Sequence, residues 1–239
     1  MLADTADASG RSGALSRSLH LPATSRLELI EFIADELPRW RDRRDRKKKT
    51  SETALTAQLC GHLNSAARHS PGWDFVQFRM EEPDEENEGR KLDLAPSPCA
   101  TTVWIEGRRH TDFDPLFPIE CKRLPTPRSN ARDEREYVIS RYSSTGGIQR
   151  FKAAHHGSAH RLGVMIGYLQ EETGEVWSER IAGWISELAK SMEAGWTVKD
   201  LIYLERHVES LGLTVLRSSH ARQKNLPEIE LRHLWLVMG

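Results

Sequence analysis

The sequence predicts an α/β protein with a mixed central sheet flanked by helices. Three strands are predicted at 73–80, 90–96 and 101–106, separated by polar turns, and the first of them is rich in aromatic and β-branched residues. The most apolar run, 161–169, has the length and the Val and Ile content of a buried strand. Residues 178–192 have the spacing of an amphipathic helix. Strands interspersed with helices on this scale are typical of an α/β fold.

The length predicts one domain with short appendages. The chain has 239 residues, which is within the range of a single large domain. Residues 1–22 are rich in Ala, Ser, Gly and Asp, and we expect them to be flexible. Residues 23–239 are expected to form the domain, with an N-terminal helix (25–49) and a C-terminal extension (about 175–239).

Composition restricts the environment and the partners. Three cysteines, an odd number without a CxxC pair, favour a reducing compartment. No apolar run is long enough for a membrane span, and the first residues lack the apolar core of a signal peptide, so we expect a cytoplasmic protein without membrane contact. The net charge of -1 means that an anionic partner must be met by a local basic patch.

A first helix is expected from Ser25. Ser25 and Glu28 have capping-box spacing, and Ile30, Ala34 and Leu37 follow at helical intervals. Pro38 weakens or ends this helix.

A basic run follows at 39–49. Such runs are commonly solvated connectors, but clustered Lys and Arg also bind phosphate backbones. The second interpretation gives a nucleic-acid-binding set: Arg39, Arg41, Arg43, Arg44, Arg46, Lys47, Lys48 and Lys49.

A second helix is expected to be capped by Thr50 or Ser51. Its buried stripe is formed by leucines at 55, 59 and 63. Glu52 lies in its first turn, where the helix dipole alone favours an acid.

Two further acids lie on predicted strands. Asp93 is flanked by Leu92 and Leu94 after an acidic turn, and an acid in an apolar strand is costly unless it has a partner or a function. In the strand 118–124, Glu120 and Lys122 point to the same face and the cysteine between them to the other. Solvated faces and cross-strand ion pairs are the common explanation for Glu-x-Lys.

The later elements complete the sheet. We expect two helices separated by a Gly146-Gly147 break, the second including Gln149, and then the buried strand, the amphipathic helix and late strands. The ranges are 133–142 and 148–154 for the first two helices, and 213–216 and 229–238 for the late strands.

These elements can assemble a metal site. Three successive strands can form an antiparallel meander, and a strand after a crossover helix adds parallel to it. Asp93 and Glu120 on neighbouring strands would lie about 5 Å apart, so their carboxylates could share Mg²⁺. The metal would activate water and offset charge on a scissile phosphate. Lys122 would orient the attacking water or stabilise the pentacovalent transition state at that phosphate.

This order of residues resembles the PD-(D/E)XK nuclease superfamily, with the restriction-endonuclease-like fold. Asp93 in KLDLAP, and Glu120 and Lys122 in FPIECKRL, match its motif, although Leu92 replaces the first proline. Glu52 matches an acid on the first core helix of many members, and Gln149 and Arg150 match residues on the helix after the motif. The resemblance covers about residues 50–170.

The resemblance implies an Mg²⁺- or Mn²⁺-dependent enzyme that hydrolyses DNA, in a restriction or phage-defence context. Asp93, Glu120 and Glu52 would be the metal ligands, Lys122 the charge stabiliser and Gln149 a water or ligand positioner. Arg123 and Arg150 would join the basic run in binding DNA. A homodimer is compatible, since cutting both strands requires two active sites, as is a partner protein of a defence system.

Two alternatives remain at this stage: an inactive nucleic-acid-binding or assembly module on the same fold, and a nuclease for RNA or branched DNA. His220, Arg222 and His233 could reach phosphate, but buried structural histidines are favoured. The adjacent His155 and His156 would diverge on a helix and not share an ion. The sequence has no P-loop, zinc spacing or Gly-x-Ser-x-Gly elbow.

Overall fold

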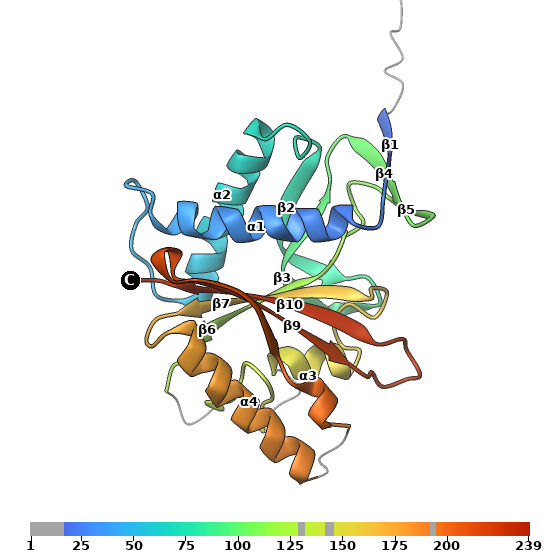
Figure 1. Cartoon of the computed structure of the whole chain (residues 1–239). Coiled ribbons are helices and arrows are strands. Elements are labelled where there is room, and N and C mark those ends of the chain that lie inside the picture. Colours follow the sequence, from blue (N-terminus) through green and yellow to red (C-terminus); the bar gives the residue numbers. More distant parts are fainter. Residues whose placement is uncertain (1–16, 129–131, 142–145, 192–194) are drawn as a thin grey trace, which may run out of the picture.

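A seven-stranded mixed sheet forms the centre of the molecule (Figure 1). The computed structural model describes residues 17–128, 132–141, 146–191 and 195–239. The strand order is β2-β3-β6-β7-β10-β9-β8. The bounds are β2 (Val76–Asp84), β3 (Asn87–Pro98), β6 (Ile119–Leu124), β7 (Leu162–Leu169), β8 (Tyr203–Val208), β9 (Leu213–His220) and β10 (Ile229–Val237).

The pairing directions follow the expected crossover rule. β2, β3 and β6 pair antiparallel, as expected for a meander. β7 then adds parallel to β6, with a helix in the connection between them, as expected for a strand that follows a crossover helix. β10 lies parallel to β7, and β9 and β8 continue antiparallel from it. The C-terminal segment therefore completes the central sheet.

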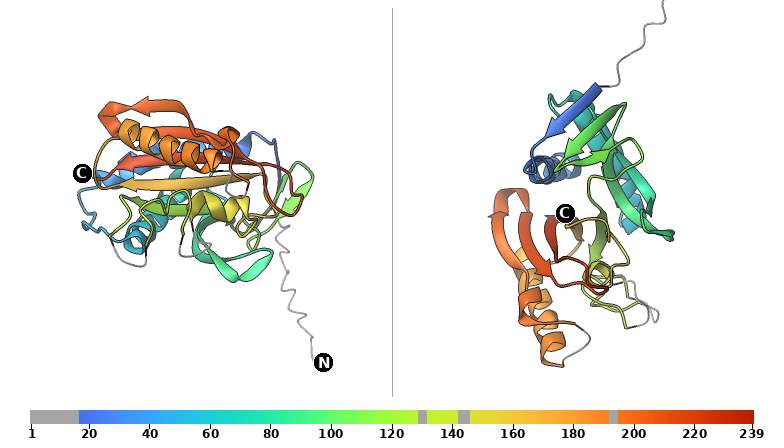
Figure 2. Two further views of the ribbon diagram at one scale, coloured as in Figure 1. Left: turned by 90° about the horizontal axis from the view of Figure 1, so that it is seen from below. Right: turned by 90° about the vertical axis from the view of Figure 1, so that its right-hand side faces the viewer.

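Helices cover both faces of this sheet (Figures 1 and 2). α1 (Ser25–Arg41) and α2 (Glu52–His69) lie on one face, and α3 (Gly147–Lys152) and α4 (Gly174–Lys190) on the other. Each face has its own apolar core, one with Leu55 and Ile166 and the other with Ile181 and Trp235. Single 3-10 turns occur at Val198–Asp200 and Glu209–Leu211. None of the helices in the described residues is long and apolar enough to cross a membrane.

α1 differs from the expected helix at both ends. Thr24 is the N-cap residue and its side chain makes no capping hydrogen bond, so the predicted Ser25-Glu28 box is wrong. Pro38 stays inside the helix, which ends at Arg41 and not at 49. Burial of Leu37 and Trp40 offsets the missing hydrogen bond at Pro38. Residues 42–49 include no apolar side chain that could be buried, so no packing favours an extension of the helix.

α2 confirms the prediction. The Ser51 side chain accepts a hydrogen bond from the backbone N–H of Ala54, as a helix cap should. Leu55, Leu59 and Leu63 are fully buried against the sheet. The start of α2, which carries Glu52, is thereby fixed by local signals and by packing.

The β2-β3 hairpin is longer than its sequence indicated. β2 begins at Val76 and continues to Asp84, so most of the expected acidic loop 81–89 belongs to strands. Acidic residues are poor strand formers alone, but pairing with β3 supplies the backbone hydrogen bonds.

A second, three-stranded sheet lies beside the first. β1 (Arg17–Leu21) pairs parallel with β4 (Thr101–Ile105), which pairs antiparallel with β5 (Arg108–His110). The expectation of flexibility for 1–22 is therefore wrong for 17–21, and residues 1–16 lie outside the described residues. The strand expected at 101–106 is confirmed. Pairing to β4 is a non-local contact that composition does not indicate.

The helix expected at 133–142 is wrong. Residues 134–138 form turns, and the Asp133 carboxylate accepts hydrogen bonds from the N–H groups of Arg135 and Arg141. Gly146 does not separate two helices but lets two chain segments touch. A Cβ on Gly146 would lie 2.4 Å from the Ile139 backbone. The next helix and the amphipathic helix are confirmed as α3 and α4, except that residue 192 lies outside the described part.

His220 and His233 are fully buried, in agreement with the structural interpretation. Ser218 Oγ lies 2.6 Å from His220 Nε2 and 2.7 Å from His233 Nε2. His220 Nδ1 lies 2.7 Å from an oxygen of Asp200. Arg222 instead donates to the backbone oxygens of Gly157 and Pro227.

These side chains belong to a buried series of hydrogen bonds that runs from Trp235 to Asp200, and the groups at its two ends fix the direction in which each bond is donated. Trp235 Nε1 donates to the Tyr137 hydroxyl, which lies 2.8 Å from His233 Nδ1. An indole can only donate and a carboxylate can only accept. Every group is satisfied if each donates toward Asp200 and both histidines are neutral. Burial lowers the pKa of His220 and of His233 in agreement with this arrangement.

These histidines predict an acid-sensitive fold. Because their folded-state pKa lies below the unfolded value of about 6.5, the folded state binds fewer protons, and stability falls as pH drops below that value. Each histidine contributes up to about 1.4 kcal/mol per pH unit. In urea unfolding, His233→Gln should lose less stability than the wild type between about pH 7 and about pH 5. The exposed His69→Gln is the control, and an equal pH slope in His233→Gln and wild type would contradict the assignment.

Candidate active site

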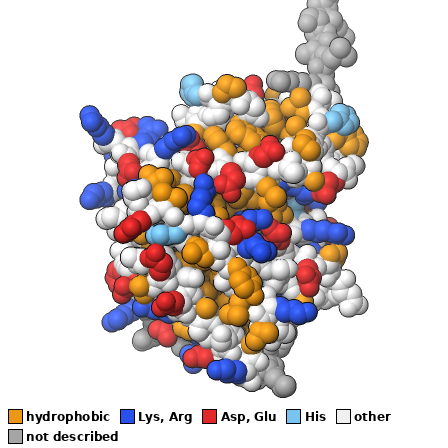
Figure 3. All heavy atoms as spheres, viewed as in Figure 1, with side chains coloured by type: hydrophobic (Ala, Val, Ile, Leu, Met, Phe, Trp, Pro, Cys, Tyr) orange, Lys and Arg blue, Asp and Glu red, His pale blue; other side chains and the backbone are white. Residues whose placement is uncertain are grey.

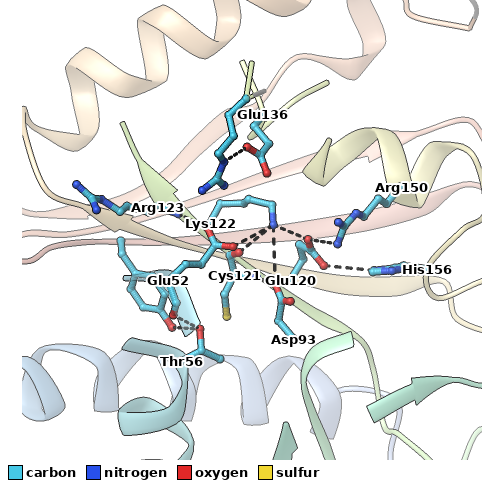
Figure 4. A network of polar contacts seen from close by, with 12 residues as sticks. Glu52, Thr56, Asp93, Glu120, Cys121, Lys122, Arg123, Glu136, Arg150 and His156 are labelled. Carbon is cyan, nitrogen blue, oxygen red and sulfur yellow. Dashed lines mark hydrogen bonds and ion pairs between the residues drawn. The ribbon is translucent and has the colours of Figure 1, made fainter. Parts of the chain in front are cut away.

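Three carboxylates from three elements surround the ammonium of Lys122 (Figure 4). Lys122 Nζ lies 2.7 Å from an oxygen of Glu120, its neighbour on β6. It lies 3.5 Å from Glu52 on α2 and 4.0 Å from Asp93 on β3. The predicted acids and base therefore converge at one place.

The backbone of β6 holds two of these acids in position. Asp93 accepts a hydrogen bond of 2.8 Å from the N–H of Cys121. Glu52 accepts one of 2.9 Å from the N–H of Arg123. β3 and α2 are thus attached to the motif strand through the site residues themselves. The helix dipole favours an acid at position 52 but does not explain why its carboxylate accepts a hydrogen bond from the N–H of Arg123.

Glu120 is buried beside Lys122, Arg150 and His156. Arg150 Nη1 lies 2.5 Å from one of its oxygens and His156 Nδ1 lies 3.3 Å from the other. Burial alone would raise the pKa of Glu120, but Lys122, His156 and Arg150 hold it down, to about 2. Glu120 is therefore a permanent anion at the centre of the site.

The pKa of Asp93 is shifted in the opposite direction from that of Glu120. Its side chain is 30% exposed and lines a small opening of about 60 Å³ with Glu52 and Thr56. Burial and the charge of Glu120 raise the pKa of Asp93 to about 7, against the effect of Lys122. The two carboxylates are thus close enough to repel each other, the condition under which a cation between them is favoured.

Lys122 stays charged despite its burial. Burial by itself would lower the pKa of the ammonium, but Glu120, Glu52 and Asp93 raise it above its usual value. A fully charged ammonium beside an opening is a fixed positive group for an anionic ligand.

The structure places the other predicted site residues differently. Arg150 reaches Glu120. Gln149 turns away, because its side-chain oxygen accepts hydrogen bonds from the N–H groups of Ser140 and Gly146. The guanidinium of Arg123 donates to the backbone oxygen of Thr50. Arg150 and Arg123 therefore border the site, whereas Gln149 holds the backbone N–H groups of Ser140 and Gly146.

Several side chains of the basic run make contacts within the protein and are not free to bind a ligand. Arg41 donates to the backbone oxygens of Leu211 and Val237, and Arg46 lies over the Trp40 ring. Arg39 and Arg43 pair with Glu36 and Asp45. The exposed remainder is Arg44 with Lys47, Lys48 and Lys49. Basic side chains project from the left edge of Figure 3, where Figure 1 shows the loop between α1 and α2.

His156 belongs to the site but was not identified from the sequence. It is 2% exposed and contacts Glu120 from beyond α3. The sequence drew attention to His156 only as one of two adjacent histidines, His155 and His156. Adjacent residues do not share a face of a helix or a strand, so this pair predicts no common contact. Only the crossover from β6 to β7 brings His156 back to Glu120.

The acids of the candidate site include carboxylates that could hold Mg²⁺ together with ligands from outside the protein. Among the described residues, no three or more His, Cys, Asp or Glu side chains form a metal-ligand cluster. Mg²⁺ needs only one or two carboxylates and takes its other ligands from water and phosphate. Asp93 and Glu120 supply such hard oxygens, and Glu52 lies across Lys122 from them.

The chain matches no protein-family model, no curated protein and no solved structure. Function therefore rests on what this geometry can do. The groups that this geometry offers are an anionic Glu120, a Glu52 held by the strand backbone and a charged Lys122.

Removing the central ammonium should destabilise the fold. Lys122→Met leaves the buried Glu120 with fewer cations, which typically costs about 3–5 kcal/mol. Lys91→Met is the matched control, since it breaks an ion pair with Glu81 in which both side chains are about 60% exposed, and it should cost at most about 1 kcal/mol. Equal losses in urea unfolding would show that Lys122 is not the central partner.

Proposed function

We propose that this chain is an Mg²⁺-dependent nuclease with a restriction-endonuclease-like fold, which hydrolyses phosphodiester bonds in DNA. The observation that supports it most is the convergence of Asp93, Glu120 and Glu52 on Lys122. The order of elements is also consistent with this fold. An acid-bearing helix precedes three antiparallel strands, and a helix then leads to a parallel strand.

The residues would divide the work as follows. Asp93 and Glu120 would hold Mg²⁺, with Glu52 as a supporting ligand. Once bound, Mg²⁺ supplies water activation and neutralises charge on the scissile phosphate. Arg150 and His156 hold Glu120 as an anion in a fixed position. Lys122 offers a charged ammonium to the phosphate oxygen that gains negative charge in the transition state.

DNA would be held by the exposed part of the basic run. Arg44 and Lys47–Lys49 lie in the loop that leads directly into α2 and Glu52. Their charges would bind backbone phosphates next to the cleavage site without regard to sequence. A restriction or phage-defence role, a homodimer for double-strand cutting and a partner protein are compatible extensions of this proposal.

One rival function has an observation in its favour. Lys122 already balances the surrounding acids, so the same residues could serve as an ion-pair network in an inactive binding or assembly module. The two functions differ in whether the site takes up metal and cuts nucleic acid.

Cleavage assays decide between them. With Mg²⁺ or Mn²⁺, the wild type should cut plasmid, linear or single-stranded DNA, and an RNA panel tests the alternative substrate. Asp93→Asn and Lys122→Ala should each lower the rate by about 100-fold or more, because each removes a group that acts on the transition state. The exposed Asp74→Asn should keep full activity. Full activity in folded Asp93→Asn protein would refute the nuclease assignment.

The basic loop makes a separate prediction about salt. Replacing Lys47, Lys48 and Lys49 by Ala should weaken DNA binding at all sequences alike. The slope of log K against log salt should decrease by up to about 0.9 for each lysine that contacts a duplex phosphate. The control replaces Lys190, Lys199 and Lys224, which are exposed elsewhere. An unchanged slope in the loop variant would assign the loop to a connector role.

A further inference from the structure

A polar cavity of about 680 Å³ adjoins the candidate site at the carboxyl ends of β6 and β7. Carboxyl ends of neighbouring parallel strands are the usual place for ligands in α/β sheets. Its lining includes Arg123, which directly follows Lys122 and whose N–H donates to Glu52. We call this cavity, with its further lining residues Arg128, Glu134, Glu171, Trp177, Arg180 and Trp184, the β6-β7 groove.

One wall of the groove is a stack of flat side chains on α4. The guanidinium of Arg180 lies 4.5 Å from the centre of the Trp177 ring. Trp177 is fixed by a hydrogen bond of 2.9 Å from its Nε1 to the backbone oxygen of Glu171. Trp184 meets it edge to face at 6.2 Å. Trp177 is only 2% exposed, so Arg180 and Trp184 form the accessible surface of this stack.

The charges in the groove do not suit a bare anion. Three arginines, at 123, 128 and 180, are matched by three glutamates, at 134, 171 and 172. Such a lining offers donors and acceptors in equal measure. The Nε of Arg123 is a buried donor that has no hydrogen-bond partner within the described part of the chain.

A nucleobase fits these features. Its edge carries both donors and acceptors, which pair with glutamate and arginine side chains. Its face stacks on tryptophan rings and on guanidinium planes. The groove is also of the size of ordinary small-molecule pockets, about 300–1,000 Å³.

We propose that the β6-β7 groove takes an unpaired nucleobase of the strand that the site cuts. The proposal rests on the nuclease function above and specifies its substrate. A base inside a duplex has its edge paired and both faces stacked, so it can enter the groove only when it is unpaired. The substrate class is therefore DNA with single-stranded character near the cut, such as a single strand, a flap or a frayed end.

Binding measured without divalent metal tests the groove apart from catalysis. A labelled single strand and the same sequence as a duplex are titrated with the full chain. Trp184→Ala should weaken single-strand binding by about five- to 160-fold, the range for loss of one stacked base, and change duplex binding less than about twofold. Trp184→Phe should restore most of the affinity, because an aromatic face remains. Trp104→Ala, on β4 beside His20, is the matched control.

The outcomes are separable from those of the cleavage assay. Selective loss in Trp184→Ala supports the groove, even if the wild type cuts nothing and the nuclease assignment fails. Equal loss for single strand and duplex overturns the groove, as does a loss of the same size in Trp104→Ala. No preference of the wild type for the single strand also overturns it, whether or not DNA is cut.

Discussion

The centre of this structure depends on the ion pairs that the buried ammonium of Lys122 makes with three acids. Three acids from β3, β6 and α2 face one another at a distance where their charges repel. Placing two charges in the interior costs several kcal/mol each unless they are closely paired. Lys122 supplies that pairing for all three acids. The same side chains therefore attach α2 and β3 to β6 and form the candidate site.

The short helix α3 joins this site to the C-terminal part of the sheet. Arg150 reaches Glu120 on β6, and two residues later Lys152 reaches Asp200 at 2.6 Å. Asp200 ends the buried polar chain that passes through His220. Buried polar groups of this kind are tolerated only when every member is satisfied. The same few residues thus position the anion of the site and fix the packing of β9 and β10.

Two surfaces near the site differ in chemistry, and they meet where Arg123 of the groove donates to the backbone oxygen of Thr50, next to the basic loop. The exposed lysines of the loop before α2 offer positive charge. The β6-β7 groove instead offers balanced charge and flat surfaces. Phosphates and bases require these two kinds of surface. Under the nuclease function that we propose, a strand bound at the site would meet both surfaces.

The sequence by itself determined the elements whose signals are local. The capped start of α2, the alternation around Glu120 and Lys122 and the apolar strand β7 follow from short-range periodicity. Only the tertiary structure decided which distant segments meet: β1 with β4, the turns at 134–138, Arg41 with the sheet, and Arg150 and His156 with Glu120. These contacts are made by residues with no distinctive spacing. Their positions depend on chain crossovers and on burial, which no local pattern encodes.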